Sequence, residues 1–229
     1  AFPGWCSKTA YNRSQILYRI GEMLEGRRSQ FLDELMLQGS SKKVAEKEIN
    51  QSIHRIIYYA GWADKYQQIF SRVNPVALLY FNFSYPEPTG VVSTFAPNDS
   101  AVIGLISIVA PIIAGGNTVV VLASEENQLC SITFAEVLHT SDVPGGVVNI
   151  LTGHRSELLE QFSSHMDVNA IVYCGTEPEE IKLVQENAAL NVKRPIVYSD
   201  ENWLDKNTQD PYRILNTLET KTTWHPVGV

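Results

Sequence analysis

The sequence predicts an α/β protein in which a doubly wound parallel sheet follows a set of N-terminal helices, with a small β element and a C-terminal strand beside it. In the second half of the chain, short runs rich in Val and Ile alternate with longer helical stretches. Strands buried on both faces are continuously apolar, and parallel strands need crossover connections that are usually helical. In the first third, apolar residues recur instead at helical spacing.

Three helices are expected in the first third of the chain. The first carries one apolar stripe, formed by Ile16, Leu17, Ile20, Met23 and Leu24. A second is expected over residues 29–38, where Gly39 ends it. The third is expected over residues 42–69, so the chain opens with a helical block before any strand.

A β-rich stretch comes next, and strands and helices then alternate. Residues 78–85 alternate in polarity, Pro86 and Pro88 are expected to break that strand, and residues 90–95 form the next one. The remaining expected elements are helices over 101–114, 128–139, 157–164 and 178–190, and strands over 118–122, 147–151, 168–174 and 195–198. Residues 199–211 are polar, which is typical of a linker, and residues 218–224 read as one more strand.

Composition and charge exclude several classes of function. The formal net charge is -7 and no cluster of Lys or Arg occurs, so nucleic-acid binding is not expected. No apolar run is long enough to span a membrane, and no signal peptide is visible in a chain that starts at Ala1 in mid-pattern, as a piece of a longer protein would. The cysteines lack C-x-x-C spacing, which favours a reducing, cytoplasmic location. The histidines lack metal-ligand spacing, so no metal site is expected.

Three sequence blocks carry a family resemblance. Residues 58–64 read YYAGWAD, residues 116–120 read GNTVV, and residues 144–153 read PGGVVNILTG. These blocks resemble the aldehyde dehydrogenase superfamily, which has Y-Y-A-G-W-A-D, G-N-T-V-V and P-x-G-V-V-N-x-x-T-G at the corresponding places. Trp5 and Arg13 also fit the N-terminal helix pattern of that superfamily. The resemblance implies the Rossmann-like cofactor domain of an aldehyde dehydrogenase.

The resemblance also implies how the chain is divided. Residues 1–199 correspond to the cofactor domain, residues 200–215 to a linker, and residues 216–229 to an oligomerisation strand. The expected parts of the first segment are N-terminal helices over 5–70, a β element over 78–95 and an αβ core over 96–199. In the family a whole catalytic domain separates the cofactor domain from that strand. The chain therefore looks like the second, non-catalytic module of a family 16 aldehyde dehydrogenase, which carries a complete catalytic module upstream.

The groups that aldehyde oxidation requires are replaced in this chain. The reaction needs a cysteine thiolate, a general base and oxyanion donors. The family's G-Q-x-C motif is absent, and Cys174 lies in YCGT where the family has F-T-G-S. The general-base motif E-L-G-G-K is replaced by PIVYSD at residues 195–200, and the oxyanion asparagine of P-W-N-F-P is replaced by Asp99. No catalytic residue is therefore expected, and Asn98, with Asp99 and Ser100, is expected to form a turn or an N-cap before the following helix.

The cofactor site implied by the resemblance keeps only some of the family's residues. Three residues still match cofactor-binding positions of the family: Glu125, Gly175 and Thr176. The ribose-binding lysine is replaced by Leu122, and Glu125 without it also suits a helix start. Residues 177–180 bring three carboxylates to the helix N-terminus where the family holds the pyrophosphate. We therefore expect no bound cofactor, and NAD or NADP if the site still functions.

These losses leave three hypotheses about function. The first is assembly by a pseudoenzyme domain, because exposed strand edges recruit partner strands, with an upstream catalytic module or a second copy of the chain as partner. The second is an NAD(P)-dependent aldehyde oxidoreductase that another chain completes, with this chain still binding the cofactor. The third is a different ligand in the vacated cleft, where the acidic helix start favours a cation or a peptide amine. Cofactor binding to this chain distinguishes the second hypothesis from the first.

Overall fold

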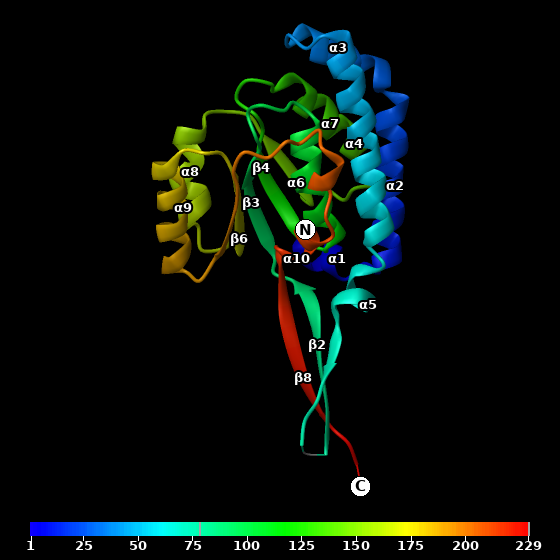
Figure 1. The fold of residues 1–229 in the computed structure, drawn as a ribbon, viewed down its shortest axis with the longest axis vertical. Coiled ribbons are helices and arrows are strands. Elements are labelled where there is room, and N and C mark those ends of the chain that lie inside the picture. The colour runs from blue at the N-terminus through cyan, green and yellow to red at the C-terminus, as the bar shows by residue number, and fades with distance from the viewer. Residues whose placement is uncertain (78, 229) are drawn as a thin grey trace.

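The computed structural model describes residues 1–77 and 79–228, and it has a layered body from which a narrow arm extends (Figure 1). The helices are α1 (Phe2–Cys6), α2 (Ala10–Gly26), α3 (Arg28–Leu37), α4 (Lys42–Trp62), α5 (Tyr66–Phe70), α6 (Ile103–Ala114), α7 (Leu129–His139), α8 (Arg155–Ser164), α9 (Pro178–Leu190) and α10 (Tyr212–Leu215), with a 3-10 turn η1 (Lys206–Thr208). The strands are β1 (Arg72–Asn74), β2 (Tyr80–Pro88), β3 (Val91–Phe95), β4 (Thr118–Leu122), β5 (Val148–Leu151), β6 (Ala170–Cys174), β7 (Arg194–Tyr198) and β8 (Leu218–Pro226). None of the described helices combines the length and the apolar character needed to cross a bilayer.

The centre of the body is a five-stranded sheet in the order β5-β4-β3-β6-β7, and every neighbouring pair is parallel. β3 is the first strand of this sheet along the sequence. β4 and β5 follow on one side of it, and β6 and β7 then lie on the other side. The predicted doubly wound sheet is therefore confirmed. The carboxyl ends of β3 and β6 border the point where the winding reverses, which is where open α/β sheets bind ligands.

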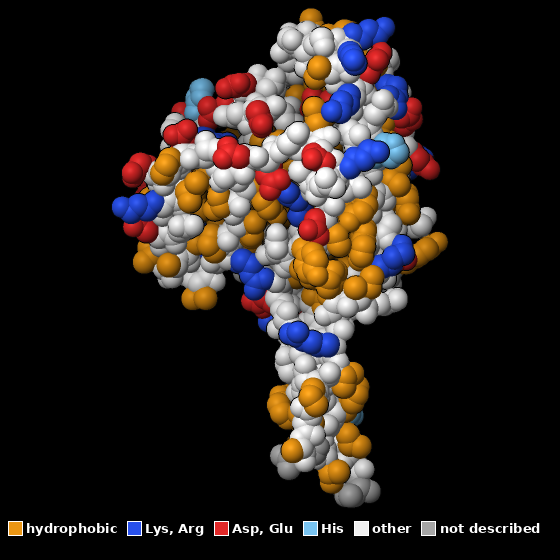
Figure 2. Space-filling model, in the orientation of Figure 1, with side chains coloured by type: hydrophobic (Ala, Val, Ile, Leu, Met, Phe, Trp, Pro, Cys, Tyr) orange, Lys and Arg blue, Asp and Glu red, His pale blue; other side chains and the backbone are white. Residues whose placement is uncertain are grey.

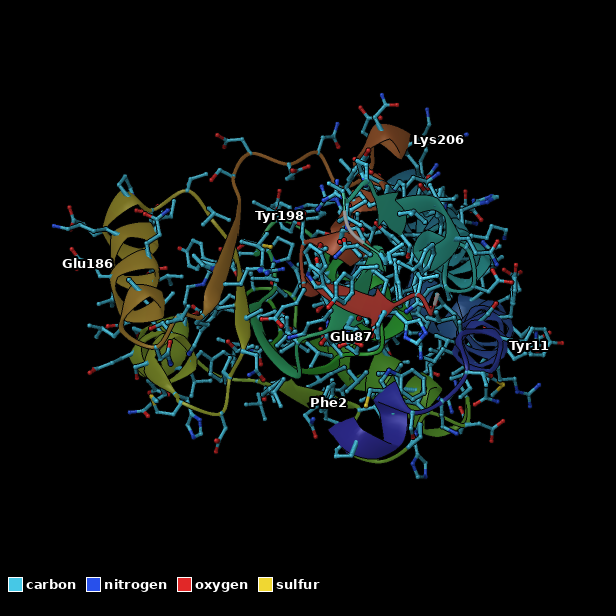
Figure 3. The ribbon with its side chains drawn as sticks, turned by 90° about the horizontal axis from the view of Figure 1, so that it is seen from below. Phe2, Tyr11, Glu87, Glu186, Tyr198 and Lys206 are labelled. Carbon is cyan, nitrogen blue, oxygen red and sulfur yellow. The ribbon has the colours of Figure 1, made fainter. Side chains whose placement is uncertain are left out.

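Helices cover both faces of this sheet. α8 and α9 lie on one face, where Phe95, Phe162 and Val184 belong to one buried cluster. α6 lies on the other face, and α2 and α4 pack over it as an outer layer. Figure 3 looks along the arm and shows this order, with Glu186 of α9 at one outer side and Tyr11 of α2 at the other. Every residue of α6 is buried, and Ser107 is the one polar side chain in an otherwise apolar sequence.

The start of α6 is capped partly from another helix. Glu48 of α4 accepts hydrogen bonds at Oε1 from the backbone N–H groups of Val102 (2.8 Å) and Ile103 (3.2 Å). Ser100, as expected for a capping residue, accepts at Oγ from the N–H of Gly104 at 2.8 Å. The first N–H groups of a helix lack intrahelical partners, so a buried helix end requires acceptors of this kind.

The helix expected over residues 42–69 is divided in the structure. α4 ends at Trp62, and α5 begins at Tyr66 after a turn. The break reorients the chain so that Tyr66 is fully buried and its hydroxyl donates to the carbonyl of Gly115 at 3.2 Å. Burying this aromatic ring outweighs the helical periodicity that continues through the turn.

β2 runs through Pro86 and Pro88, which were expected to end the strand. β1 pairs with only three residues of β2 and reaches neither proline, so in the described residues both lie at an edge on that side. A proline lacks the backbone donor of a ladder, and an edge tolerates that loss. The expected strand over 218–224 is β8, which extends to Pro226 and pairs with the whole of β2. Leu78, at the start of the expected strand, and Val229 lie outside the described residues.

The arm is the three-stranded antiparallel sheet β1-β2-β8, and its two faces differ. On one face Asn74 Nδ2 donates to Asn82 Oδ1 at 2.6 Å. On the other face the rings of Phe81, Phe83 and Tyr85 form a row, with neighbouring centroids 5.5 and 5.9 Å apart. Successive side chains of a strand point to opposite faces, so the alternating sequence of β2 places Asn82 and Ser84 on one face and the aromatic row on the other. Tyr80 and Trp224, whose ring centroids are 5.9 Å apart, lie on the Asn82 face towards the tip of the arm.

The segment between β7 and β8, residues 199–217, packs against the body and is called the strap below. Trp203 of the strap is buried. Arg55, buried in α4, donates to the carbonyls of Trp203 (3.2 Å) and Asp205 (3.1 Å) and to Thr208 Oγ1 (2.9 Å). This polar segment is therefore anchored to the body, because two of its backbone carbonyls and one threonine side chain accept from a buried guanidinium.

Candidate functional site

A cavity of about 340 Å³ opens at the carboxyl ends of β3, β6 and β7. It lies beside the point where the winding of the sheet reverses, the usual ligand position in this class of fold. Its walls come from strand ends, from the starts of α8 and α9, and from the strap. The lining residues include Asp99, Cys174, Gly175, Thr176, Tyr198 and Trp203.

Carboxylates dominate the charge of this cavity. Asp99, Glu177, Asp200 and Glu201 line it together with the guanidinium of Arg155. Burial raises the pKa of the Asp99 carboxyl, and a neighbouring glutamate adds to that rise. Carboxylates in a partly enclosed space repel phosphate oxygens. The electrostatics therefore oppose a pyrophosphate at this position.

Arg155, the first residue of α8, extends into the crevice between β3 and β6. Its Nη2 donates to the carbonyls of Ala96 (3.2 Å) and Cys174 (3.0 Å), and its Nη1 donates to the Tyr173 hydroxyl (3.3 Å). The side chain is 11% exposed and lies 3.7 Å from Glu180 Oε2. Sequence reasoning missed this residue. Its positive charge at a helix start opposes the helix macrodipole, and that unfavourable placement is the signal that could have identified it.

Glu125 follows β4 and is engaged with the start of α8. Its Oε1 accepts a hydrogen bond from the backbone N–H of Arg155, and its Oε2 lies 3.9 Å from His154 Nδ1. The N–H of Glu125 in turn donates to Asn98 Oδ1 at 3.0 Å. Of the two roles expected for Asn98, a turn or an N-cap of α6, the cap is wrong, because its side chain binds the loop after β4, while residues 98–99 form a turn. Glu125 does mark a helix start, but it caps α8 from a distant part of the sequence.

Gly175 follows β6 at a position where space is short. A Cβ there would lie 2.7 Å from the Tyr173 hydroxyl oxygen and 2.8 Å from Nη1 of Arg155, so a side chain at this position would displace these two groups from where they lie. Thr176 comes next and is exposed, and α9 then begins without a side-chain cap. The structure thus brings Gly175 and Thr176 to the cavity wall, and their assignment to a cofactor stays a prediction.

The buried cysteines are poor nucleophiles. Burial raises the pKa of the Cys174 thiol far above its ordinary value and raises that of Cys130 to about 12. A thiol reacts as the thiolate, which such burial disfavours at neutral pH. Cys6 is partly exposed, and its thiol donates to the carbonyl of Pro3 at 3.4 Å. Across residues 1–77 and 79–228, no three His, Cys, Asp or Glu side chains are grouped to hold a metal ion.

The doubly wound parallel sheet places the chain in the Rossmann-like fold class, to which dinucleotide-binding domains belong. The family model described as aldehyde dehydrogenase family matches residues 1–198. Over 194 residues, the chain is 32% identical to aldehyde dehydrogenase, cytosolic 1, of Elephantulus edwardii, covering 83% of this chain and 38% of that protein. It is 31% identical to human aldehyde dehydrogenase 1A1 with the same coverage. The chain belongs to the aldehyde dehydrogenase family, as the sequence blocks predicted.

Solved structures share the fold. The structure of PnpE in complex with nicotinamide adenine dinucleotide matches with a TM-score of 0.81 at 25% identity, covering 86% of this chain and 40% of that one. The aldehyde dehydrogenase of Brucella melitensis biovar abortus 2308 also matches with a TM-score of 0.81, at 21% identity, covering 87% of this chain and 41% of that one. The chain thus spans well under half the length of the proteins it resembles.

Proposed function

We propose that this chain is a non-catalytic, aldehyde dehydrogenase-like domain of the cytoplasm that serves oligomerisation or protein–protein interaction beside a catalytic aldehyde dehydrogenase module. Its place as the second module of a family 16 enzyme is part of this proposal. The observation that carries it is the arm, which projects from the body and presents apolar side chains that the body does not cover (Figure 2).

The exposed side chains of the arm favour a protein partner. Leu79, Trp224 and Phe81 are 62%, 57% and 46% exposed, respectively. Apolar groups gathered on a narrow projection are costly to leave in water, and such patches mark interaction surfaces. The aromatic row on the same sheet supplies flat, rigid side chains of the kind that dominate protein interfaces.

The edge of β8 favours a partner that contributes a strand. In the described residues the order β1-β2-β8 leaves the outer edge of β8, Leu218–Pro226, without a neighbour. A strand edge presents a row of N–H and C=O groups that another strand can satisfy. The proposed partner is the upstream catalytic module that the family resemblance implies, or a second copy of this chain.

The test weakens the arm and leaves the body folded. Trp224→Ser and Phe81→Ser remove exposed rings, and truncation from Thr220 onward removes most of the unpaired edge. Sedimentation velocity of the chain alone, and of an equimolar mixture with the catalytic module, measures association. We expect each change to raise the dissociation constant about tenfold or more, because each removes about 1.4 kcal/mol or more of interface energy.

Leu190→Ser is the matched control, because Leu190 is 84% exposed on α9 of the body. It should leave association unchanged. Normal assembly of both arm variants and of the truncated chain would refute the assembly role. Aldehyde-dependent reduction of NAD that appears only when this chain is added to another would favour the alternative, a cofactor-binding part of an oxidoreductase.

A further inference from the structure

The crevice between β3 and β6 contains a side chain of the protein itself. The guanidinium of Arg155 donates to the carbonyl of Ala96, which follows β3, and to the carbonyl of Cys174, which ends β6. It therefore crosses the crevice from one wall to the other. In doubly wound sheets a dinucleotide occupies the crevice at this reversal point.

The surroundings of Arg155 suit a cation. The guanidinium carbon lies 5.1 Å from the ring centroid of Tyr173 and 5.8 Å from that of Phe95, and Glu180 Oε2 lies 3.7 Å from Nη1. Aromatic faces and a carboxylate both attract a guanidinium. With four hydrogen-bonding or charged partners and little exposure, this side chain is held in one position.

Two of the three residues that match the family's cofactor positions hold Arg155 instead. Glu125 accepts the hydrogen bond of the Arg155 backbone N–H, which fixes the start of α8. Gly175 leaves the space that Nη1 of Arg155 and the Tyr173 hydroxyl fill. Glu125 and Gly175 are thus explained by the arginine without any cofactor, whereas Thr176, which is exposed, has no hydrogen bond with it among the described residues.

We propose that Arg155 is an internal occupant of the dinucleotide crevice, which closes this chain to NAD and NADP and ties the two halves of the sheet together at their carboxyl ends. The carboxylates of Asp99, Glu177 and Asp200, which line the cavity and in the described residues form no hydrogen bond or ion pair with the guanidinium, add a charge barrier that is separate from this occupancy. The proposal does not depend on the role of the arm, so failure of either one leaves the other standing.

The experiment separates the occupant from the charge barrier with two variants of the whole chain. The first replaces Asp99, Glu177 and Asp200, which line the cavity, by Asn, Gln and Asn, and keeps Arg155 and Glu180. The second adds Arg155→Ala to those three changes. Calorimetric titration with NAD and with ADP-ribose measures binding, and circular dichroism confirms folding.

The wild-type chain and the first variant should show no saturable binding up to about 1 mM ligand, and the second variant should bind at least tenfold more tightly than that limit. Saturable binding by the first variant would overturn the proposal, because the crevice would then be open beside Arg155. A folded second variant that does not bind would overturn it too. NAD binding by the wild type that Arg155→Ala abolishes would make Arg155 a phosphate ligand and not an occupant.

A measurement on the wild-type chain applies even if the Arg155→Ala variant does not fold. Nitrogen-15 NMR should show slowly exchanging guanidinium N–H signals for Arg155, since the group is enclosed and donates to fixed carbonyls. Arg155→Lys identifies these signals by their loss. Rapidly exchanging signals, or signals that shift in a saturable way with NAD, would contradict an enclosed internal occupant.

Discussion

The crevice and the arm differ in whether their polar backbone groups have hydrogen-bond partners. In the crevice, the carbonyls of Ala96 and Cys174 accept from Arg155, and the first N–H of α8 donates to Glu125. On the arm, the outer edge of β8 has no neighbouring strand in the described residues. A backbone group that already has a hydrogen-bond partner is less available to a ligand, whereas an unpaired strand edge presents free donors and acceptors to another strand. At the strand ends where this class of fold binds small molecules, the chain places its own arginine beside a cavity of about 340 Å³, whereas the outer edge of β8 meets no strand in the described residues.

Side chains are more tightly packed near the crevice than on the arm. Phe95, at the end of β3, is fully buried and its ring centroid lies 5.0 Å from that of Phe162. Phe81, on the arm, is nearly half exposed. The same residue type therefore supports the fold at one site and is available for contact at the other.

The largest expected effect on the free energy of unfolding comes from replacing the buried one of these two phenylalanines. Phe95→Ala should lower the free energy of unfolding by about 3–5 kcal/mol, because it leaves a cavity in a packed cluster. Phe81→Ser should change it by only about 1 kcal/mol, because nearly half of this side chain is already exposed. Urea denaturation of the monomer measures both. Equal losses for the two variants would mean that the arm is part of the core.

A smaller effect is expected at the joint between body and arm. Asn117, fully buried, accepts at Oδ1 from the N–H of Gly90 (2.8 Å) and donates from Nδ2 to the carbonyl of Thr217 (2.8 Å). Asn117→Leu should cost about 2–3 kcal/mol, because a buried donor and a buried acceptor lose their partner. Chemical denaturation followed by circular dichroism provides the value. The exposed Asn50→Leu is the matched control, and an equally small loss in both would show that the joint is not held by this amide.

The smallest effect concerns a pair on β8. The hydrogen bond from Lys221 lowers the pKa of the Glu219 carboxyl, so the stabilisation from this pair is present above the ordinary range of glutamate and is lost as the pH falls through the lowered pKa. Lys221→Met should return the pKa of Glu219 toward its ordinary value, which carbon-13 NMR titration measures. Both side chains are about half exposed, so unfolding experiments should detect no change. Lys182→Met, a change distant from Glu219, is the control and should leave the pKa of Glu219 unchanged. If Lys221→Met also leaves that pKa unchanged, Lys221 does not lower it.

The sequence predicted the αβ core well because its elements are defined by local periodicity. The expected helix over 178–190 and strand over 118–122 coincide with α9 and β4. It failed where a tertiary contact overrides a local pattern. The expected helix over 42–69 breaks because Tyr66 becomes buried against Gly115, a residue far along the chain.

The candidate site was predicted in part. The order of strands and helices puts residues after β6 at the carboxyl edge of the sheet, so Gly175 and Thr176 line the cavity as that order implies. Arg155 was missed because its acceptor carbonyl at Ala96 is 59 residues away. Spacing patterns cover a few residues, and a contact of this range leaves no periodic trace.

The sequence by itself determined the fold class and the family, because periodic burial and short motifs are local properties of the chain. Tertiary structure alone decided that the polar strap is anchored by Arg55 and that Glu125 caps α8. It also decided that a guanidinium occupies the crevice. The physical reason is that hydrogen bonding and charge compensation depend on distances through space between groups that the sequence places far apart.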